Sequence, residues 1–293
     1  MIERNILLVG LPETGKTSFL AGFYHLVSSA EMEGKTLSQY KISKDNTYLN
    51  LIHEKWLQCE TLQRTLTVTG ISKGDVVMHI KDERTQDRLD LKIPDIAGES
   101  FNTHFADRIW ELKYREVVNS SSGILLFINP SKVLPHVLID EISAALDGFN
   151  EDSSDEVDGK NSAVLEKSAE FDIEKVPSQV VLLDIIDSHL EEVRTEPQSI
   201  AIVISAWDEI IEQKITPEKW LEMNLPLVFQ FLICNFERIS FKVFGVSAQG
   251  GSYKEMTEKL LQHDEPAQKI VVQEGEHFHN NICAPIEWII EQW

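Results

Sequence analysis

Hydrophobic positions along the chain follow two alternating patterns. Continuous apolar runs are typical of strands that are buried on both faces of a parallel sheet, and they occur at residues 6–9, 123–129, 200–205 and 241–246. Between these runs, apolar residues recur at the spacing of amphipathic helices. This spacing predicts helices over residues 16–30, 45–59, 104–118, 178–194, 217–222, 226–238, 252–262 and 283–292. In this pattern the run at 241–246 is the last strand.

Two further segments, 75–81 and 87–94, predict strands of a different kind. Leu89, Leu91 and Ile93 alternate with polar residues, which is typical of a strand with one buried face. Turn-forming polar residues separate the two segments, so we expect a hairpin that adds one antiparallel strand to the sheet. Strands that otherwise alternate with helices predict an α/β fold with a doubly wound, mostly parallel sheet.

The charge of the chain narrows the classes of partner. Its 293 residues include 27 Lys and Arg against 48 Asp and Glu, for a formal net charge of −21. This excess disfavours general nucleic-acid binding, which needs clustered Lys and Arg, and electrostatic docking on anionic membranes. Residues 150–176 alone hold nine acidic residues and three Lys, and we expect them to form a solvated insertion. The hydrophobic fraction of 42% is enough for a sizeable core.

Cysteines and apolar segments predict a cytoplasmic protein. The three cysteines, Cys59, Cys234 and Cys283, form no CxxC pair, which fits a reducing compartment. No apolar stretch reaches about 18 residues, so we expect no membrane span. His277 and His279 have no third ligand nearby in the sequence, and we interpret them as loop residues instead of a metal site.

A glycine-containing motif follows the first apolar run. Residues 10–17 read GLPETGKT and match GxxxxGK[ST] in full, between a predicted buried strand and a predicted amphipathic helix. Backbone N–H groups of such a loop wrap a phosphate at the helix N-terminus, and Gly15 leaves room for this approach. Lys16 would reach the β- and γ-phosphates, and the Thr17 hydroxyl would ligate Mg²⁺. We expect the Glu13 carboxylate to point outward.

A second motif, DIAGE at residues 95–99, follows directly from the segment at 87–94. A carboxylate at a strand end, here Asp95, can hold Mg²⁺ through water, and the Gly98 N–H can bond a γ-phosphate. The order of phosphate motif, hairpin and DIAGE resembles the Ras-like GTPases of the translation-factor class. The resemblance implies a P-loop NTPase of Ras-like GTPase fold, with GTP or GDP as ligand and Mg²⁺ as cofactor.

The run at 200–205 leads into Ser205, Ala206, Trp207 and Asp208. The matching strand end of Ras-like GTPases carries NKxD, whose Asp accepts two hydrogen bonds from guanine and whose Lys lies over the base. Asp208 matches that Asp, whereas Ser205 replaces the Asn and Ala206 replaces the Lys. Trp207 is a candidate to cover part of the base. Without the resemblance, Asp208 is interpreted as a cap of the next helix.

The run at 241–246 is followed by Ser247, Ala248 and Gln249, which resemble the SAK loop of the same family. Backbone amides of that loop contact the guanine oxygen, and Gln249 here replaces the Lys. The motifs and the resemblance together give the expected nucleotide-binding residues as Gly10, Glu13, Thr14, Gly15, Lys16, Thr17, Ser18, Gly98, Ser205, Trp207, Asp208, Ser247, Ala248 and Gln249.

Catalysis and the first switch are assigned through the resemblance. Ras-like GTPases use a Thr before the hairpin as a Mg²⁺ ligand, and we favour Thr65 among the threonines at 61, 65, 67 and 69. Glu99 replaces the glutamine that orients the attacking water; a carboxylate there would either position the water or repel the γ-phosphate. His104 is a further candidate to orient water, with a core or surface histidine as the alternative. The expected catalytic residues are Glu99, Lys16 and Thr65, and the expected metal ligands are Thr17, Thr65 and Asp95.

Together the motifs predict one enlarged GTPase domain over residues 1–293, with a helical insertion at 31–60, the acidic insertion at 150–176 and a C-terminal helical extension at 263–293. We expect it to hydrolyse GTP to GDP and phosphate with Mg²⁺ and to switch conformation toward a protein partner. WLQxxxxxRT, DIAGE and SxWD resemble the double-GTPase group of prokaryotic conflict systems, which implies a companion GTPase or an effector as partner. The alternatives are a slow or inactive nucleotide-binding scaffold and a P-loop ATPase or kinase.

Overall fold

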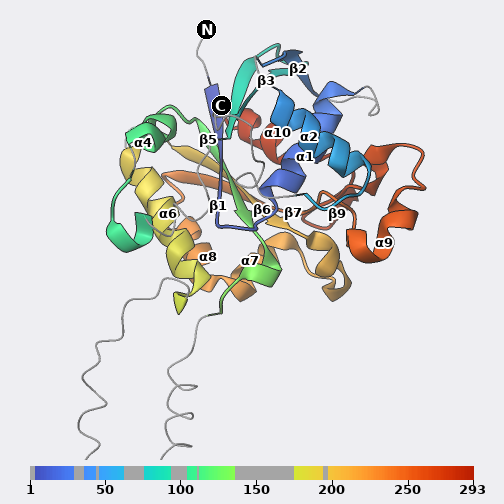
Figure 1. Ribbon diagram of the computed structural model, residues 1–293. Coiled ribbons are helices and arrows are strands. Elements are labelled where there is room, and N and C mark those ends of the chain that lie inside the picture. The colour runs from blue at the N-terminus through green and yellow to red at the C-terminus, as the bar shows by residue number, and fades with distance from the viewer. Residues whose placement is uncertain are drawn as a thin grey trace, which may run out of the picture.

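A mixed sheet with helices on both faces forms the centre of the molecule (Figure 1). The computed structural model describes residues 4–29, 36–43, 46–62, 76–93, 104–110, 112–135, 175–193 and 197–293. Within these residues the strand order is β2-β3-β4-β1-β5-β6-β7-β8-β9. The strands that run parallel in the middle of this described sheet are β1 (Arg4–Gly10), β4 (Arg88–Ile93), β5 (Gly123–Ile128), β6 (Gln198–Ser205) and β7 (Ile239–Ser247). The predicted α/β fold with a mostly parallel sheet is confirmed.

Continuous apolar runs form the middle strands because these strands pack on both faces. In β1, Ile6 and Leu8 belong to one hydrophobic cluster, and Leu7 and Val9 belong to the other. The helices that complete the first cluster are α1 (Lys16–Ser28), α2 (Thr47–Leu57) and α10 (Ala284–Glu291). Those that complete the second are α4 (Leu112–Asn119), α6 (Ser178–Glu192), α7 (Pro217–Asn224) and α8 (Pro226–Cys234). The sheet therefore separates two cores.

Both ends of the sheet are antiparallel. The predicted hairpin is present as β3 (Val76–Asp82) paired with β4, and β2 (Leu37–Lys41) pairs with the other edge of β3. At the far end, β8 (Val271–Glu274) pairs with β7, and β9 (His277–His279) pairs with β8. The expectations of a single antiparallel strand and of a last strand at 241–246 are therefore wrong. Strands of four and three residues offer too few positions for an alternation pattern to reveal them.

Two helical predictions, at 31–60 and at 104–118, need correction. The segment at 31–60, predicted to be a helical insertion, contains strand β2 before helix α2. The helix predicted over 104–118 stops after residue 107 and resumes as α4. Arg108 has φ 57°, which an α-helix does not accommodate, so the backbone leaves the helical path there. Of the acidic insertion at 150–176, all but the last two residues lie outside the described part of the chain.

The C-terminal extension at 263–293 is also more than helical. After α9 (Tyr253–Leu260) it contains the β8–β9 hairpin, so His277 and His279 lie on a strand and not in a loop. Gly275, with φ 57°, makes the turn between the two strands. The short 3₁₀ helices described are η2 (Pro130–Lys132), η5 (Trp207–Glu209), η6 (Ile211–Gln213) and η7 (Pro266–Lys269). Among the helices described, each is too short or too polar to cross a membrane.

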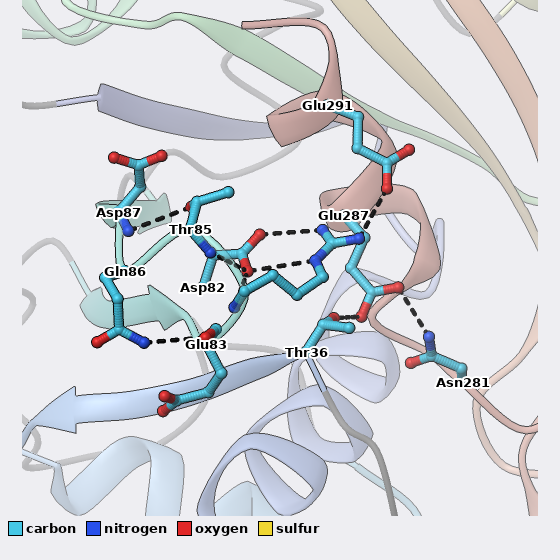
Figure 2. A network of polar contacts seen from close by, with 10 residues as sticks. Thr36, Asp82, Glu83, Thr85, Gln86, Asp87, Asn281, Glu287 and Glu291 are labelled. Atoms are coloured by element: carbon cyan, nitrogen blue, oxygen red, sulfur yellow. Dashed lines mark hydrogen bonds and ion pairs between the residues drawn. The ribbon is translucent and has the colours of Figure 1, made fainter.

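A polar network joins the β3–β4 turn to α10 (Figure 2). Asp82, fully buried at the end of β3, accepts a 2.7 Å hydrogen bond from the Arg84 backbone N–H and pairs with the Arg84 guanidinium at 2.9 Å. The same guanidinium reaches Glu291 of α10 at 2.9 Å, and Thr36 donates to Glu287 one turn earlier. Burial raises the pKa of Asp82, but the hydrogen bonds from Arg84 outweigh it and hold that pKa below its ordinary value. The network thus fixes the last helix against the hairpin.

Candidate functional site

The 10–17 loop connects β1 to α1 at the carboxyl edge of the sheet and passes close to two other strands. A Cβ on Gly10 would lie 2.7 Å from the carbonyl oxygen of Phe127 in β5, and a Cβ on Gly15 would lie 2.9 Å from the Cβ of Ser205 in β6. Gly15 also has φ 80°, in the left-handed region that favours glycine. Both glycines are therefore required for the loop to lie against the ends of β5 and β6.

The Lys16 ammonium is held within this loop by the loop itself. Its Nζ donates to the carbonyl oxygens of Gly10 at 2.6 Å and Leu11 at 2.8 Å, and lies 3.2 Å from Thr14 Oγ1. Thr14 is buried and donates its hydroxyl to Leu11 O at 2.8 Å. A fixed cation at the N-terminus of α1 adds to the positive end of the helix dipole, so the loop presents a positive potential that suits an anion.

Glu13 lies on the outer side of the loop, bound to the segment after β5. Its carboxylate pairs with Lys132 Nζ of η2 at 2.6 Å, and its carbonyl oxygen accepts a 3.0 Å hydrogen bond from the Asn129 side chain. Glu13 has φ 58°, an uncommon conformation for a residue with a side chain, and these two contacts hold it there. Lys132 offsets the negative charge that Glu13 brings close to the loop.

The two segments predicted to read a base meet at the same edge of the sheet. Because β6 and β7 are neighbouring parallel strands with Ser205 opposite Val246, the residues that follow them lie side by side. The Ser247 hydroxyl donates to Asp208 Oδ1, and it accepts a 3.1 Å hydrogen bond from the Gly250 N–H. The carboxylate of Asp208 is thus fixed by a partner that the sequence places 39 residues away.

Trp207 does not take the position expected for it. Its side chain is completely buried, and its Nε1 donates to Gln273 Oε1 of β8 at 2.7 Å. Its ring packs so closely on Gly245 that a Cβ there would lie 2.3 Å from the indole. An indole enclosed between β7 and β8 cannot stack on a base that enters from solvent, so the suggestion that Trp207 covers the base is corrected to a core role.

Two buried side chains, Trp56 and Lys269, support the 247–249 loop. Sequence reasoning did not identify either as a site residue. Trp56 of α2, fully buried, donates its Nε1–H to Ala248 O at 2.8 Å. The ammonium of buried Lys269 donates to Trp56 O at 2.6 Å and lies 3.7 Å from the centroid of the Trp56 ring. In sequence the only signal was the position of Trp56 on the apolar face of a predicted helix. On the open side, Gln249 Nε2 donates to Ser18 Oγ of α1 at 2.8 Å.

A family model described as Double-GTPase 1 matches residues 7–289, nearly the whole chain. The chain belongs to the Double-GTPase 1 family. The resemblance to double GTPases drawn from the scattered motifs is thereby confirmed. Among curated proteins, no sequence matches this Double-GTPase 1 member.

Solved structures similar to this Double-GTPase 1 member are distant from it. The S. cerevisiae Ski7 GTPase-like domain bound to GDP and inorganic phosphate is 14% identical, with a TM-score of 0.41 over 91% of this chain and 52% of that one. The Trypanosoma brucei Arl6 BBS3 small GTPase with bound GppNp is 12% identical, with a TM-score of 0.37 over 89% and 95%. In a second Ski7 structure, bound to GTP, the match covers 44% of that chain, so this chain spans about half the length of the Ski7 structures.

Several expected site residues of the Double-GTPase 1 member lie outside the described residues. They are Thr65, Asp95, Gly98 and Glu99. Of the expected metal ligands, Thr17 is described, and it lies half-buried in the first turn of α1. Within the described part of the chain, no group of three His, Cys, Asp or Glu side chains could hold a metal.

His104, the further candidate to orient water, is the first residue of the 104–110 segment, and its buried ring faces α6. Trp110 donates its indole N–H to His104 Nε2, which also lies 3.4 Å from Ser188 Oγ and 3.8 Å from Asp184 Oδ2. Burial lowers the pKa of His104, so the ring favours its neutral form. Since its Nε2 already accepts a hydrogen bond, the contacts agree with the alternative of a core histidine.

Proposed function

We propose that this Double-GTPase 1 member binds a guanine nucleotide with Mg²⁺ and hydrolyses GTP to GDP and phosphate. The observation that carries the proposal is that one edge of the sheet holds both a positively charged loop and an oriented carboxylate. The Lys16 ammonium and the N-terminus of α1 suit phosphate, and the Asp208 carboxylate, oriented by Ser247, suits a base with adjacent N–H donors. Membership of the Double-GTPase 1 family supports both assignments.

At the phosphate end, the 10–17 loop acts as the P-loop of a Ras-like GTPase fold. A bound nucleotide would replace the Gly10 and Leu11 carbonyl oxygens as partners of Lys16. Phosphate oxygens carry a full negative charge, so the exchange gains charge-assisted hydrogen bonds. The N–H of Gly15, the N-cap residue of α1, would donate to the same anion.

At the base end, Asp208 is suited to guanine and not to adenine. Its two carboxylate oxygens can accept hydrogen bonds from the N1–H and the exocyclic N2–H₂ of guanine, whereas adenine presents an acceptor at N1 and a hydrogen at C2. The Ser247 hydroxyl donates to one oxygen from the side and leaves other lone pairs for the base. The Ser247 hydroxyl joins the 247–249 loop to this carboxylate, and we expect the backbone amides of the loop to meet the guanine oxygen.

Mg²⁺ fits the donor chemistry that the structure describes at this site. The Thr17 hydroxyl is an oxygen donor in the first turn of α1, beside Lys16, and Mg²⁺ takes few protein ligands when phosphate oxygens and waters supply the others. Asp95 and Thr65 are the proposed further ligands. When bound, Mg²⁺ would neutralise charge that develops on the phosphates. The chain's own residues hold the nucleotide: Lys16 binds phosphate, and Glu99 is proposed to position the attacking water.

Hydrolysis would act as a switch toward a protein partner. Loss of the γ-phosphate would release the segments around Thr65 and residues 95–105, a change of order that a partner can read. The proposed partner is a companion GTPase or an effector, within a conflict system of the cytoplasm, and the proposed unit is one enlarged domain over residues 1–293.

The first test is nucleotide binding by the purified chain. We expect GDP and GTP to bind and ATP to compete poorly, as measured by displacement of a fluorescent guanine nucleotide. Lys16→Ala should abolish binding. Lys219→Ala is the matched control, since it removes an exposed lysine of α7 that pairs with Glu222 of the same helix, and it should retain binding. A preference for ATP would refute the base assignment, and normal binding by Lys16→Ala would refute the phosphate assignment.

The second test is turnover. Single-turnover hydrolysis of GTP should yield GDP and phosphate in wild type, and Glu99→Ala should slow it while leaving GTP affinity within a fewfold of wild type. If wild type binds GTP but shows no hydrolysis, even with a partner GTPase added, the chain is a nucleotide-binding scaffold and the enzymatic part of the proposal is wrong.

A further inference from the structure

Helix α8 is apolar on all of its sides, although it lies at the margin of the molecule, beside α6 and α7 (Figure 1). Its nine residues read PLVFQFLIC, and Gln230 is the one polar residue among them. The inner side of the helix adds fully buried Val228 and Leu232 to the second core, whereas Leu227 and Ile233 are exposed on the outer side. A helix that is apolar all round is typical of a protein interior, so the outer side is suited to contact a further surface.

The exposed apolar surface continues past both ends of α8. Met223, near the end of α7, is 60% exposed, and Phe236, two residues after α8, is 74% exposed. Between them, residues 227, 230 and 233 follow one another at intervals of three on the outer side of the helix. The α8 face is defined here as Met223, Leu227, Gln230, Ile233 and Phe236. Contiguous exposed apolar residues of this kind mark an interaction site.

The α8 face carries no charge in a strongly charged chain. None of the residues 223–236 is Asp, Glu, Lys or Arg, although these types make up 26% of the sequence. Uncharged stretches of similar length at 17–30 and 117–131 contain most of α1 and all of β5, which are buried. Two copies of a chain with net charge −21 repel each other, and the repulsion is weakest where neither surface is charged. The α8 face is therefore a surface on which two such copies can meet.

Charged residues border the α8 face at both ends, and each end carries one charge of each sign. Lys219 and Glu222 lie on the exposed side of α7 at the first end, and Glu237 and Arg238 follow the last end. Antiparallel packing of two copies sets the first end of each face against the last end of the other. Each charge then has an opposite charge of the second copy within reach, and the two helix dipoles oppose each other.

We propose that the α8 face is a homodimer interface, on which α8 of a second copy packs antiparallel about a two-fold axis. The axis would pass close to Gln230, at the middle of the face. An amide has both a donor and an acceptor, so Gln230 can bond to its own equivalent across this axis. The contact is about one helix wide, so we expect association in the micromolar range. The proposal does not depend on the proposed nucleotide function.

Sedimentation velocity of the full chain measures the association. The average mass should rise from monomer toward dimer as the chain concentration passes through the micromolar range. Leu227→Glu and Ile233→Glu should each weaken the dimer by about two orders of magnitude, since each places a charge in the apolar contact. Leu261→Glu, at a leucine that follows α9 and is 53% exposed, is the matched control and should dimerise as wild type does. A wild-type chain that stays monomeric at millimolar concentration overturns the proposal, and so does normal association of Leu227→Glu and Ile233→Glu.

A disulfide trap tests the two-fold axis without a charged substitution. Gln230→Cys, made together with Cys234→Ser, should give a disulfide-linked dimer under mild oxidation, because the axis brings the two introduced thiols together. The other two cysteines, Cys59 and Cys283, are buried. Leu261→Cys in the same Cys234→Ser chain is the control and should remain monomeric. Absence of the cross-linked dimer from Gln230→Cys overturns the proposed axis.

Charge exchange tests which ends of the α8 face meet. Lys219→Glu and Glu237→Lys should each weaken the dimer severalfold, because each sets like charges against each other. The double variant should recover the affinity of wild type, since opposite charges then face each other again. A double variant as weak as the sum of the two single effects contradicts antiparallel packing.

A membrane surface is the other occupant that an uncharged apolar face can take. Cosedimentation of the full chain with phosphatidylcholine vesicles tests this, and wild type should stay in the supernatant. Binding to the vesicles that Leu227→Glu abolishes would assign the α8 face to a membrane and overturn the homodimer.

Discussion

In the proposed nucleotide site, single side chains at the carboxyl edge of the sheet would determine which base is accepted. The Asp208 carboxylate has a fixed direction because Ser247 donates to it and Gly250 N–H in turn donates to Ser247 at 3.1 Å. An orientation set by a chain of hydrogen bonds costs no rearrangement when a ligand arrives, so the carboxylate is preorganised for two adjacent N–H donors.

Asp208→Asn tests the proposed role of the Asp208 carboxylate by changing one of its oxygens to an amide nitrogen. An amide replaces one acceptor by a donor, which fits the C2 carbonyl of xanthine and mismatches the N2–H₂ of guanine. We expect GDP affinity to fall by about two orders of magnitude, since a buried donor is left facing a donor, and xanthosine diphosphate to bind better than GDP. Competition between the two diphosphates against a fluorescent nucleotide measures this; an unchanged preference for GDP contradicts the role of Asp208. Glu209→Gln, the adjacent acidic residue, serves as control.

The same residues show what sequence reasoning could and could not predict. Lys16 and Asp208 could be proposed from sequence because each lies at a fixed offset in a motif, and motifs encode local chemistry; their roles toward a nucleotide stay predictions. The burial of Trp207 was not predictable, since it depends on Gln273, 66 residues later, on a strand too short to be seen. Support of Ala248 by Trp56 likewise depends on a contact between residues 192 positions apart. Contacts of this kind follow from the tertiary fold and leave no local pattern.

At the scale of elements, α4 and α6 pack through a pair of buried polar rings. His189 of α6 donates its Nδ1–H to Ile185 O at 2.7 Å, which leaves Nε2 as an acceptor for the Tyr114 hydroxyl of α4 at 3.1 Å. Burial is the main cause that lowers the pKa of His189 to about 4 and raises that of Tyr114 well above its ordinary value. Both rings are therefore neutral in the folded protein near neutral pH.

This packing predicts a loss of stability in mild acid. The unfolded chain takes up a proton on His189 near its ordinary pKa of 6.5, whereas the folded chain does so near 4. Stability is therefore fully present above pH 6.5 and falls as the pH is lowered toward 4, by about 3 kcal/mol in all at 1.36 kcal/mol per pKa unit. Urea unfolding between pH 4.5 and 7.5 should show this slope, and His189→Gln should flatten it. A slope unchanged by the substitution would refute the assignment.

The contacts of Arg84 with Asp82 and Glu291 lead to a second prediction about the packing of elements. Asp82 is fully buried, so removing the Arg84 side chain leaves the Asp82 charge to the backbone N–H groups of Arg84 and Thr85. The Arg84 side chain is 42% exposed, so Arg84→Ala should reduce the free energy of unfolding by about 2 kcal/mol in urea at pH 7. Lys81→Ala, which removes an ion pair to Glu83 on the exposed side of the same strand, should change it by about 1 kcal/mol or less. Equal effects of the two substitutions would show that the network does not bear on stability.

Elements differ in how far the sequence predicted them. The middle strands were predicted because burial on both faces forces continuous apolar runs, as in β5 and β6, whose residues are all buried. Edge strands are buried on one face or less, and β9 is mostly exposed, so their composition does not separate them from loops. The break at Arg108 was missed for a different reason: the apolar spacing continues through it, and the backbone alone departs from the helix.

At the scale of the whole molecule, the proposed guanine nucleotide carries several negative charges and would have to approach a chain of net charge −21. Lys16 and the α1 N-terminus attract it at short range, whereas the remaining charges repel it at long range. Salt screens the long-range term most, because the Debye length falls from about 20 Å at 0.02 M to about 7 Å at 0.2 M. The association rate of GDP should therefore rise severalfold over this range, while its dissociation rate changes little. Stopped-flow mixing with a fluorescent GDP measures both rates. Association that slows with salt would mean that the local field of the 10–17 loop outweighs the charge of the whole chain.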